Sequence, residues 1–165
     1  MATARPQLAI AFGALTDKNL EQLRVLNTAI FPVRYDAKVY AEALACGEVT
    51  QLAFHNDVVV GAVACRLEKA PGGPKLYIIT LGVLAPYRGM GVGSRLLEKS
   101  LAVVAASLPE VTEAYLHVQT SNEEAAAFYA RFGFEKGEVV ENYYRRIDPP
   151  HAQVLRKVLA PPPAN

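Results

Sequence analysis

A run of mostly apolar residues leads straight into a glycine-rich segment and then into a long helical pattern, and this succession constrains the fold most. The run Lys75–Val83 has the sequence KLYIITLGV, whose β-branched and aromatic side chains predict a strand buried on both faces. The glycines of Pro86–Ser94 allow a tight turn, because glycine adopts positive φ without a steric penalty. A helix then continues to Pro109, with an apolar stripe formed by Leu96, Leu97, Leu101, Val104 and Leu108. The sequence therefore predicts a strand–turn–helix unit of an α/β protein.

Further strands and helices are expected on both sides of this unit. Strands are predicted at Gln7–Phe12, Thr50–Phe54, Val58–Leu67, Ala114–Gln119, Phe134–Ile147 and Gln153–Leu159. Residues Ala152–Leu159 fit a helix equally well on propensity alone. Helices are predicted after Thr16, Asp36 and Ser121, whose side chains can cap an N-terminus, and they should end at Pro32, Gly47 and Gly133.

The order of these elements predicts a mixed sheet with helices on its faces. Because a helix joins Lys75–Val83 to Ala114–Gln119, these two strands should be parallel neighbours. The sheet then changes direction beside the glycine-rich turn, where such folds bind ligands. We expect one α/β domain over residues 1–159, with about seven strands and about four helices, and a loose proline-rich tail over residues 160–165.

Charge and composition exclude several classes of protein. The 165 residues carry 17 Lys and Arg against 16 Asp and Glu, and 52% are hydrophobic, which is too apolar for a disordered chain and too neutral for a nucleic-acid binder. No apolar run approaches the roughly 20 residues of a membrane span, and we expect an intracellular protein without membrane association. Cys46 and Cys65 form no zinc or disulfide pattern, so we expect buried thiols and no metal.

The glycine-rich segment is the first candidate binding site. A helix that begins in it would direct unpaired N–H groups and its positive dipole end at one point, as a pyrophosphate requires. A dinucleotide fingerprint would need glycine in place of Ser94, and a Walker loop would need an absent Gly-Lys-Ser or Gly-Lys-Thr ending. A plain strand-to-helix turn without a ligand is the simpler alternative.

Two motifs resemble the GCN-related N-acetyltransferase (GNAT) superfamily. The spacing Arg88-x-x-Gly91-x-Gly93 resembles its coenzyme A loop. The segment Ser121–Glu123, followed by Ala127–Phe134, resembles the superfamily's helix that ends in FYxKxGF. The resemblance implies a GNAT fold and acetyl-CoA as cosubstrate. The residues expected to bind it are Leu81, Gly82, Val83, Arg88, Gly89, Met90, Gly91, Val92, Gly93, Ser94, Asn122, Tyr129 and Arg131. The alternative for the second motif is a capped helix with aromatic core contacts.

Further segments are similar to the catalytic subunits of NatE-type N-alpha-acetyltransferases, the San homologues. They are Phe31–Tyr35, Tyr77–Gly82, Tyr115–Gln119 and Asn142–Ile147. This resemblance implies acetylation of protein N-termini that keep methionine before an apolar residue, and it leaves lysine acetylation open. It also implies association with the NatA complex and its auxiliary subunit, in the cytoplasm and also in the nucleus.

The resemblance places the catalytic pair on Tyr77 and His117, at matching positions of two neighbouring strands. An α-amine with a pKa of about 7.7 to 8.0 can be deprotonated by a base near the histidine reference of about 6.5, whereas a lysine amine near 10.4 is harder to deprotonate. The alternative for His117 is a satisfied core histidine, and His55 and His151 should face solvent. Residues expected to hold the peptide are Phe31, Pro32, Val33, Tyr35, Ile79, Tyr143, Tyr144 and Ile147, where Ile79 replaces the methionine usual in the family.

Two other functions remain open at this point. A subunit with the same fold could act chiefly as a scaffold for a larger acetyltransferase complex, although the intact glycine segment and the Tyr77–His117 pair argue against a loss of activity. An enzyme with the same cosubstrate could acetylate small amines instead of peptides, which the aromatic peptide clamp makes a weaker reading.

Overall fold

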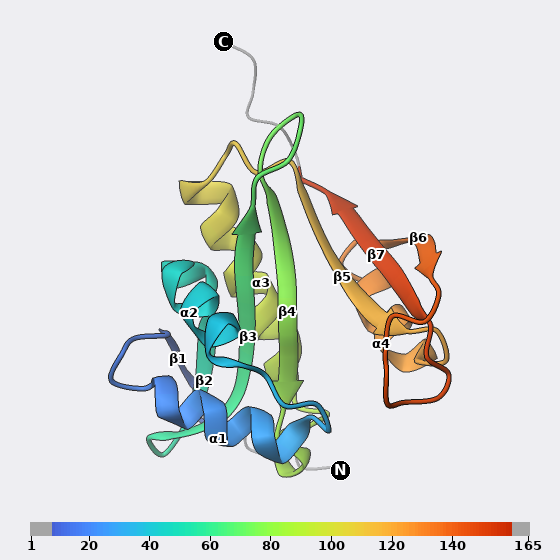
Figure 1. The fold of residues 1–165 in the computed structure, drawn as a ribbon. Helices are drawn as coiled ribbons and strands as arrows, with labels where there is room; N and C mark the ends of the chain where they lie inside the picture. Colours follow the sequence, from blue (N-terminus) through green and yellow to red (C-terminus); the bar gives the residue numbers. More distant parts are fainter. Residues whose placement is uncertain (1–7, 160–165) are drawn as a thin grey trace, which may run out of the picture. The chain divides into compact units, whose positions relative to one another are not determined.

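The computed structural model describes residues 8–159, and within them the chain forms seven strands and four α-helices (Figure 1). These residues divide into two compact units. Unit 1 contains residues 8–66 and 79–107, and unit 2 contains residues 67–78 and 108–159. The prediction of one domain over residues 1–159 stays a prediction, and the tail at residues 160–165 lies outside the described residues. None of the described helices is long and apolar enough to cross a membrane.

The strands form one mixed sheet in the order β1-β2-β3-β4-β5-β7-β6. They are β1 Ala11–Ala14, β2 Gln51–His55, β3 Val58–Glu68, β4 Lys75–Val83, β5 Glu113–Gln119, β6 Glu135–Val140 and β7 Ala152–Val158. β4 and β5 pair in parallel, with Tyr77 beside Tyr115, whereas β5 and β6 each pair antiparallel to β7. The predicted α/β fold class and the parallel crossover are therefore confirmed.

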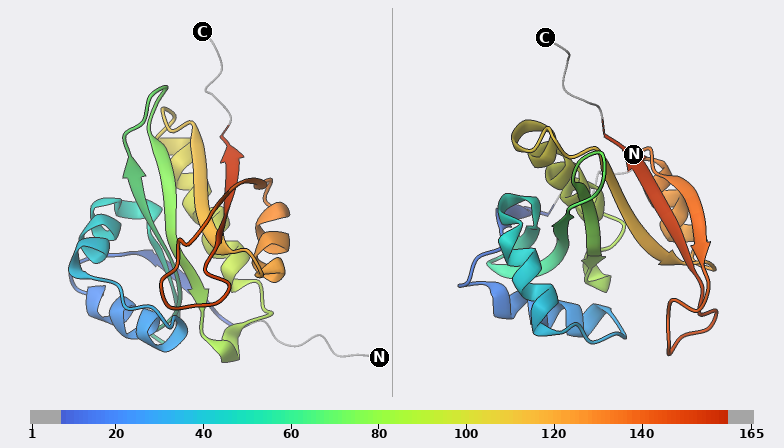
Figure 2. Two further views of the ribbon diagram at one scale, coloured as in Figure 1. Left: turned by 45° about the vertical axis from the view of Figure 1, so that its right-hand side comes forward. Right: turned by 45° about the horizontal axis from the view of Figure 1, so that its top comes forward.

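Unit 1 places helices on both faces of β2 and β3 (Figure 2). Its elements are the helices α1 Leu20–Ile30, α2 Ala37–Ala45 and α3 Val92–Ser107, with short 3-10 turns at Gly47–Val49 and Ala85–Tyr87. On one face, side chains of α1 and α2 such as Leu23 and Tyr40 form a buried cluster with Leu52 of β2. On the other face, Ser100 of α3 lies 3.6 Å from the buried Cys65 thiol of β3. Both faces of this part of the sheet are therefore covered, as the apolar strand sequences require.

Unit 2 consists of the first half of β4, the strands β5, β7 and β6, and the helix α4 Glu123–Ala130. Burial alternates along β5, where Ala114, Leu116 and Val118 are buried. The intervening residues Tyr115 and His117 are half-buried on the opposite face. One face of β5 therefore contributes to the core, and the other presents polar aromatic side chains.

Two of the predicted helix caps are wrong by one or more residues. Asp36 caps α2 as expected, and its side chain accepts a hydrogen bond from Val39 N at 3.1 Å. Thr16 instead accepts a hydrogen bond from Lys18 N within a turn, so that α1 begins only after Asn19. At α4 the capping side chain is Asn122, not Ser121, because Asn122 Oδ1 accepts from Ala125 N at 3.0 Å. Asn19 occupies the N-cap position of α1 without a side-chain capping hydrogen bond, so both helices begin later than predicted.

The ends of two strands also differ from the predictions by several residues, and the choice left open between strand and helix at Ala152–Leu159 is decided. The first strand begins at Ala11 and not at Gln7, which lies outside the described residues. β6 ends at Val140, and residues 141–151 form a loop, because Asn142 adopts φ +57°. Residues 143 and 144 are therefore loop residues and not strand residues. Ala152–Val158 is a strand and not a helix, because it pairs on both sides with β5 and β6.

Candidate functional site

Tyr77 and His117 lie together on one face of unit 2. Tyr77 of β4 is 8% exposed and stands beside Tyr115 in the parallel register, so His117 is two residues further along β5 on the same face. The Tyr77 hydroxyl lies 2.8 Å from His117 Nδ1, which is a good hydrogen bond whose donor depends on the histidine tautomer. The structure thus joins the two side chains that the sequence analysis paired.

The loop between β6 and β7 adds Tyr143 to this pair. The Tyr143 ring stacks on the His117 imidazole with centroids 4.3 Å apart and an interplanar angle of 13°. Its hydroxyl lies 3.4 Å from the Tyr77 hydroxyl. Tyr143 therefore contacts both members of the pair. Its side chain also faces solvent, because the residue is 42% exposed. Tyr144 packs edge-on against Tyr143, with centroids 5.0 Å apart.

Backbone hydrogen bonds hold this loop in place. Asn142 N donates to His151 Nδ1 at 3.1 Å, and Tyr144 N donates to Pro150 O at 2.8 Å. On β5, Gln119 Nε2 donates to Pro149 O at 2.8 Å. His151 is therefore half-buried and bonded to the loop backbone, so it faces solvent only in part. His55 is half-buried as well, with its ring beside Tyr87.

The arrangement is suited to accepting a proton from a nucleophile. An imidazole hydrogen-bonded to a phenol can act as a general base and pass the proton along the hydrogen bond. Covalent catalysis by Cys65 is disfavoured, because burial raises the pKa of its thiol to about 12. In the described residues, no group of three or more His, Cys, Asp or Glu side chains could hold a metal ion.

The glycine-rich segment in unit 1 has the geometry of an anion cradle. Gly89 and Gly91 adopt φ +76° and φ +77°, and a Cβ atom on either would meet no atom within 4 Å. α3 begins at Val92, and Arg95 N donates to Gly91 O at 3.0 Å as a first-turn hydrogen bond. The preceding N–H groups of the helix have no partner within the helix. These backbone groups fit the phosphates of coenzyme A without a field of positive charge.

The remaining predicted residues of this segment differ in exposure. Val92 is buried, Gly93 and Ser94 are half-buried, and Met90 is exposed. The Arg88 side chain folds back so that Nε donates to Val83 O at 2.9 Å. Arg88 thus ties the start of the segment to the end of β4, and its contact with a cofactor stays a prediction.

The end of β4 and the segment between α1 and α2 meet inside unit 1. A Cβ atom on Gly82 would lie only 2.8 Å from Phe31 Cζ, so a larger residue at position 82 would displace the Phe31 ring. The Phe31 ring packs edge-on against Tyr35, with centroids 6.0 Å apart. Pro32 and Val33 are exposed, and Leu81, Val83 and Ile79 are half-buried. The structure therefore brings a predicted cofactor residue, Gly82, against a predicted peptide residue, Phe31.

The three predicted cofactor residues of α4 have clear structural roles. Asn122 caps the helix. The Tyr129 ring is 6% exposed and packs between Phe128 and Phe134. Arg131 is exposed, with its guanidinium 5.6 Å from the centre of the Phe128 ring. The capped helix with aromatic packing is thus present, and the cofactor contacts of these residues stay predictions.

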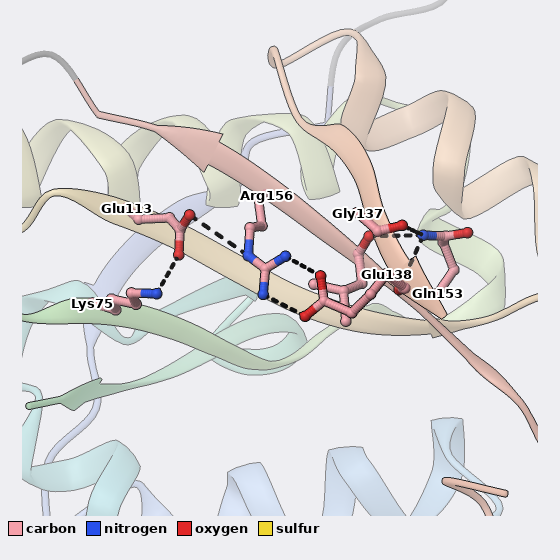
Figure 3. A network of polar contacts seen from close by, with 7 residues as sticks. Lys75, Glu113, Gly137, Glu138, Gln153 and Arg156 are labelled. Carbon is pink, nitrogen blue, oxygen red and sulfur yellow. Dashed lines mark hydrogen bonds and ion pairs between the residues drawn. The ribbon is translucent and has the colours of Figure 1, made fainter. Parts of the chain in front are cut away.

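A row of charged residues continues along the sheet of unit 2 (Figure 3). Lys75 Nζ lies 3.0 Å from Glu113 Oε2, and Arg156 bridges Glu113 and Glu138. The two hydrogen bonds from Arg156 lower the pKa of the exposed Glu138 carboxyl to about 2. Ile147 is half-buried in the loop that precedes β7.

Sequence reasoning did not identify Tyr115 and Glu68, which lie near the Tyr77–His117 pair. Tyr115 and His117 share a face of β5, and Tyr115 also contacts the Tyr77 ring with centroids 4.8 Å apart. The Tyr115 hydroxyl donates to Glu68 Oε1 at the end of β3. The alternation of residues along a strand was a signal that could have placed Tyr115 beside His117.

Comparisons with known proteins find similar chains among N-alpha-acetyltransferases. N-alpha-acetyltransferase 50 of Danio rerio is 46% identical over 153 residues, which cover 93% of this chain and 90% of the relative. The probable N-acetyltransferase san of Drosophila melanogaster is 44% identical, covering 92% of this chain and 82% of the relative. The structure of Arabidopsis thaliana Naa50 in complex with the bisubstrate analogue CoA-Ac-MVNAL has a TM-score of 0.84 and 51% identity, over 91% of this chain and 99% of that chain.

A model of the acetyltransferase (GNAT) family matches residues 20–134, a range that includes the glycine-rich segment, Tyr77, His117 and α4. With the mixed sheet, the cradle at the start of α3 and the relatives above, this match shows that the chain belongs to the GNAT acetyltransferase family.

Proposed function

We propose that this chain transfers the acetyl group of acetyl-CoA to the N-terminal amine of proteins that keep methionine before an apolar residue. The observation that carries the proposal is the 2.8 Å contact between the Tyr77 hydroxyl and His117 Nδ1, in a chain that shares its fold with Naa50. The Arabidopsis Naa50 structure contains a bisubstrate analogue whose peptide begins Met-Val, which supports this substrate class.

The proton is handled by residues of unit 2. An α-amine must lose a proton to become nucleophilic, and the Tyr77–His117 pair receives it directly or through a water molecule. Tyr143 of the β6–β7 loop packs against the pair. Its ring stacks on the imidazole, and its hydroxyl lies beside that of Tyr77. The reference pKa of an α-amine, about 7.7 to 8.0, suits this base better than that of lysine, about 10.4.

The cosubstrate is held by residues of unit 1. Acetyl-CoA, when bound, supplies the thioester whose C–S bond breaks as the new C–N bond forms. The N–H groups at the start of α3 bind its phosphates, and the backbone of Leu81–Val83 orients the thioester and stabilises the developing oxyanion. The high pKa of Cys65 supports direct attack of the amine over an acyl-enzyme route.

A peptide assay tests this proposal. The full chain is incubated with labelled acetyl-CoA and with peptides that begin Met-Leu, Met-Lys or Ser-Leu, and with an N-terminally blocked peptide that contains one internal lysine. We expect the highest kcat/KM for Met-Leu and little transfer to the blocked peptide. Equal rates on all four peptides would contradict the substrate class, and transfer to none of them would contradict a peptide acceptor.

Association with the NatA complex and its auxiliary subunit is a finer part of the proposal, supported by the resemblance to NatE-type subunits. The same resemblance supports work in the cytoplasm and in the nucleus. Size-exclusion chromatography of the full chain with a purified NatA complex tests the association, and we expect the two to elute together. Separate elution at micromolar concentrations would contradict it.

A further inference from the structure

Tyr115 has a position in unit 2 that ordinary strand packing does not require. It is the direct neighbour of Tyr77 in the parallel pair of β4 and β5, and it lies on the same face as His117. Its ring centroid is 4.8 Å from that of Tyr77 and 6.1 Å from that of His117. Tyr115 therefore contacts both members of the proposed catalytic pair.

The hydroxyl of Tyr115 is tethered away from the pair. It donates a hydrogen bond to Oε1 of Glu68, the last residue of β3. A hydrogen bond to a carboxylate is charge-assisted and stronger than one between neutral groups. The hydroxyl oxygen lies on the axis through Cβ and Cγ, so fixing the hydroxyl and the strand position fixes the direction of the Tyr115 side chain. The Tyr115 ring thus stays on one side of Tyr77.

Tyr77 contacts two tyrosines, Tyr115 and Tyr143, which come from different kinds of element. The Tyr115 ring comes from a paired strand, whereas Tyr143 comes from a loop and is 42% exposed. Peptide binding is proposed to use Tyr143, so its contacts with Tyr77 and His117 are the ones that a bound peptide can alter. The Tyr115 ring, which comes from a paired strand, is in a position to keep the Tyr77 hydroxyl directed at His117 throughout.

We propose that Tyr115 and Glu68 form a positioning pair that holds the Tyr77 hydroxyl within hydrogen-bond distance of His117 Nδ1. The proposal rests on the proposed function, in which Tyr77 and His117 accept the proton of the amine. In this proposal Tyr115 and Glu68 take no part in the proton transfer itself. They act through Tyr77, and a misplacement of about 1 Å in such a group can lower a rate by about a hundredfold.

Three substitutions and their double variant test the proposal. Tyr115→Phe keeps the ring and removes the tether, Glu68→Ala removes the acceptor, and Glu68→Gln keeps an oxygen that can accept. We expect kcat on a Met-Leu peptide to fall about tenfold in Tyr115→Phe and in Glu68→Ala, and less in Glu68→Gln. Because both single changes break the same contact, Tyr115→Phe/Glu68→Ala should lose little more than either alone.

Binding and tautomer measurements distinguish positioning from general destabilisation. The acetyl-CoA thermal shift and the KM for peptide should stay near the wild-type values, and the ¹⁵N shifts of the His117 ring should change in Tyr115→Phe. Tyr40→Phe is the matched control, because it removes a buried tyrosine hydroxyl that is bonded to Asn27 in unit 1. We expect it to lower stability and leave kcat unchanged.

Two outcomes separate this proposal from the proposed function. Wild-type kcat in both Tyr115→Phe and Glu68→Ala, or fully additive losses in the double variant, would overturn the positioning pair while the enzyme stays active. Wild-type kcat in Tyr77→Phe and His117→Ala, measured in the same assay, would overturn the proposed function itself.

Discussion

The two units differ in the kind of group that each offers for the proposed reaction. Unit 1 offers mainly backbone: glycines with φ of +76° and +77°, the N–H groups at the start of α3, and the bare Cα of Gly82 against Phe31. Unit 2 offers side chains, namely Tyr77, His117 and Tyr143, which come from two strands and one loop.

This difference follows from what each group must bind. Phosphates and a thioester carbonyl accept hydrogen bonds from backbone N–H groups. A segment with the right backbone geometry can therefore bind them without particular side chains. A proton acceptor needs a titratable side chain, so unit 2 must bring particular residue types together. Substitutions should therefore act on cofactor binding in unit 1 and on turnover in unit 2.

The largest expected effect is on turnover, from substitutions in the catalytic pair. His117→Ala removes the imidazole, and Tyr77→Phe removes the hydroxyl that lies 2.8 Å from it. General acid–base groups contribute about 100-fold to 10,000-fold, so we expect kcat on a Met-Leu peptide to fall by about 100-fold or more in His117→Ala. Acetyl-CoA should still raise the melting temperature of both variants. A variant that loses this thermal shift together with its activity would show that the two units do not separate in the proposed way.

The next effect should appear in cofactor affinity, from a substitution in unit 1. Gly91→Ala forces a side chain into φ +77°, which costs about 1 to 2 kcal/mol or shifts the cradle. We expect the Kd for acetyl-CoA, measured by calorimetry, to rise about tenfold. Gly47→Ala is the matched control, because Gly47 has φ +62° with nothing within 4 Å of its Cβ position and ends α2. Equal losses of affinity in both variants would mean that strain alone, and not the cradle, explains the effect.

The same difference between the units explains what the sequence could predict. The cradle lies within one short segment, so glycine spacing and the adjoining strand and helix were enough to locate it. β4 was predicted with the correct ends, Lys75 and Val83, because apolar and turn residues mark both boundaries. Local sequence therefore carried the information for most of unit 1, apart from the turn at Thr16 that delays α1.

Unit 2 was harder to predict because its contacts join distant segments. The family resemblance indicated Tyr77 and His117, but Tyr143 was placed on a strand, since nothing local indicated that Asn142 would adopt a positive φ. The stacking of Tyr143 on His117 depends on hydrogen bonds from the loop to His151 and Gln119. Such pairings depend on tertiary structure, which brings together residues that lie far apart in the sequence.

A smaller effect should distinguish the two contacts of Tyr143. Tyr143→Phe keeps the ring that stacks on His117 and loses the hydroxyl 3.4 Å from Tyr77. Tyr143→Leu loses both. Because stacking orients the imidazole, we expect kcat to fall about fivefold in Tyr143→Leu and about twofold in Tyr143→Phe, as aromatic pairs contribute about 0.5 to 1.5 kcal/mol. Steady-state kinetics with the Met-Leu peptide checks this, and a larger loss of kcat in Tyr143→Phe would show that the hydroxyl matters more than the ring.

The smallest expected effect concerns stability and the exposed charges of unit 2. Arg156 lowers the pKa of Glu138 from an ordinary value of 4.5 to about 2, so the carboxylate stabilises the folded state above pH 4.5. This contribution is lost as the pH falls through about 2, where the folded carboxyl takes up its proton. We therefore expect Glu138→Gln to melt slightly below the wild type at pH 6, with a difference that shrinks from pH 5 to pH 2. Added salt should shrink it too, because the pair is exposed and screened. Glu141→Gln removes an exposed glutamate charge from the same unit, and an equal pH-dependent difference in that variant would assign the effect to net charge and not to the pair with Arg156.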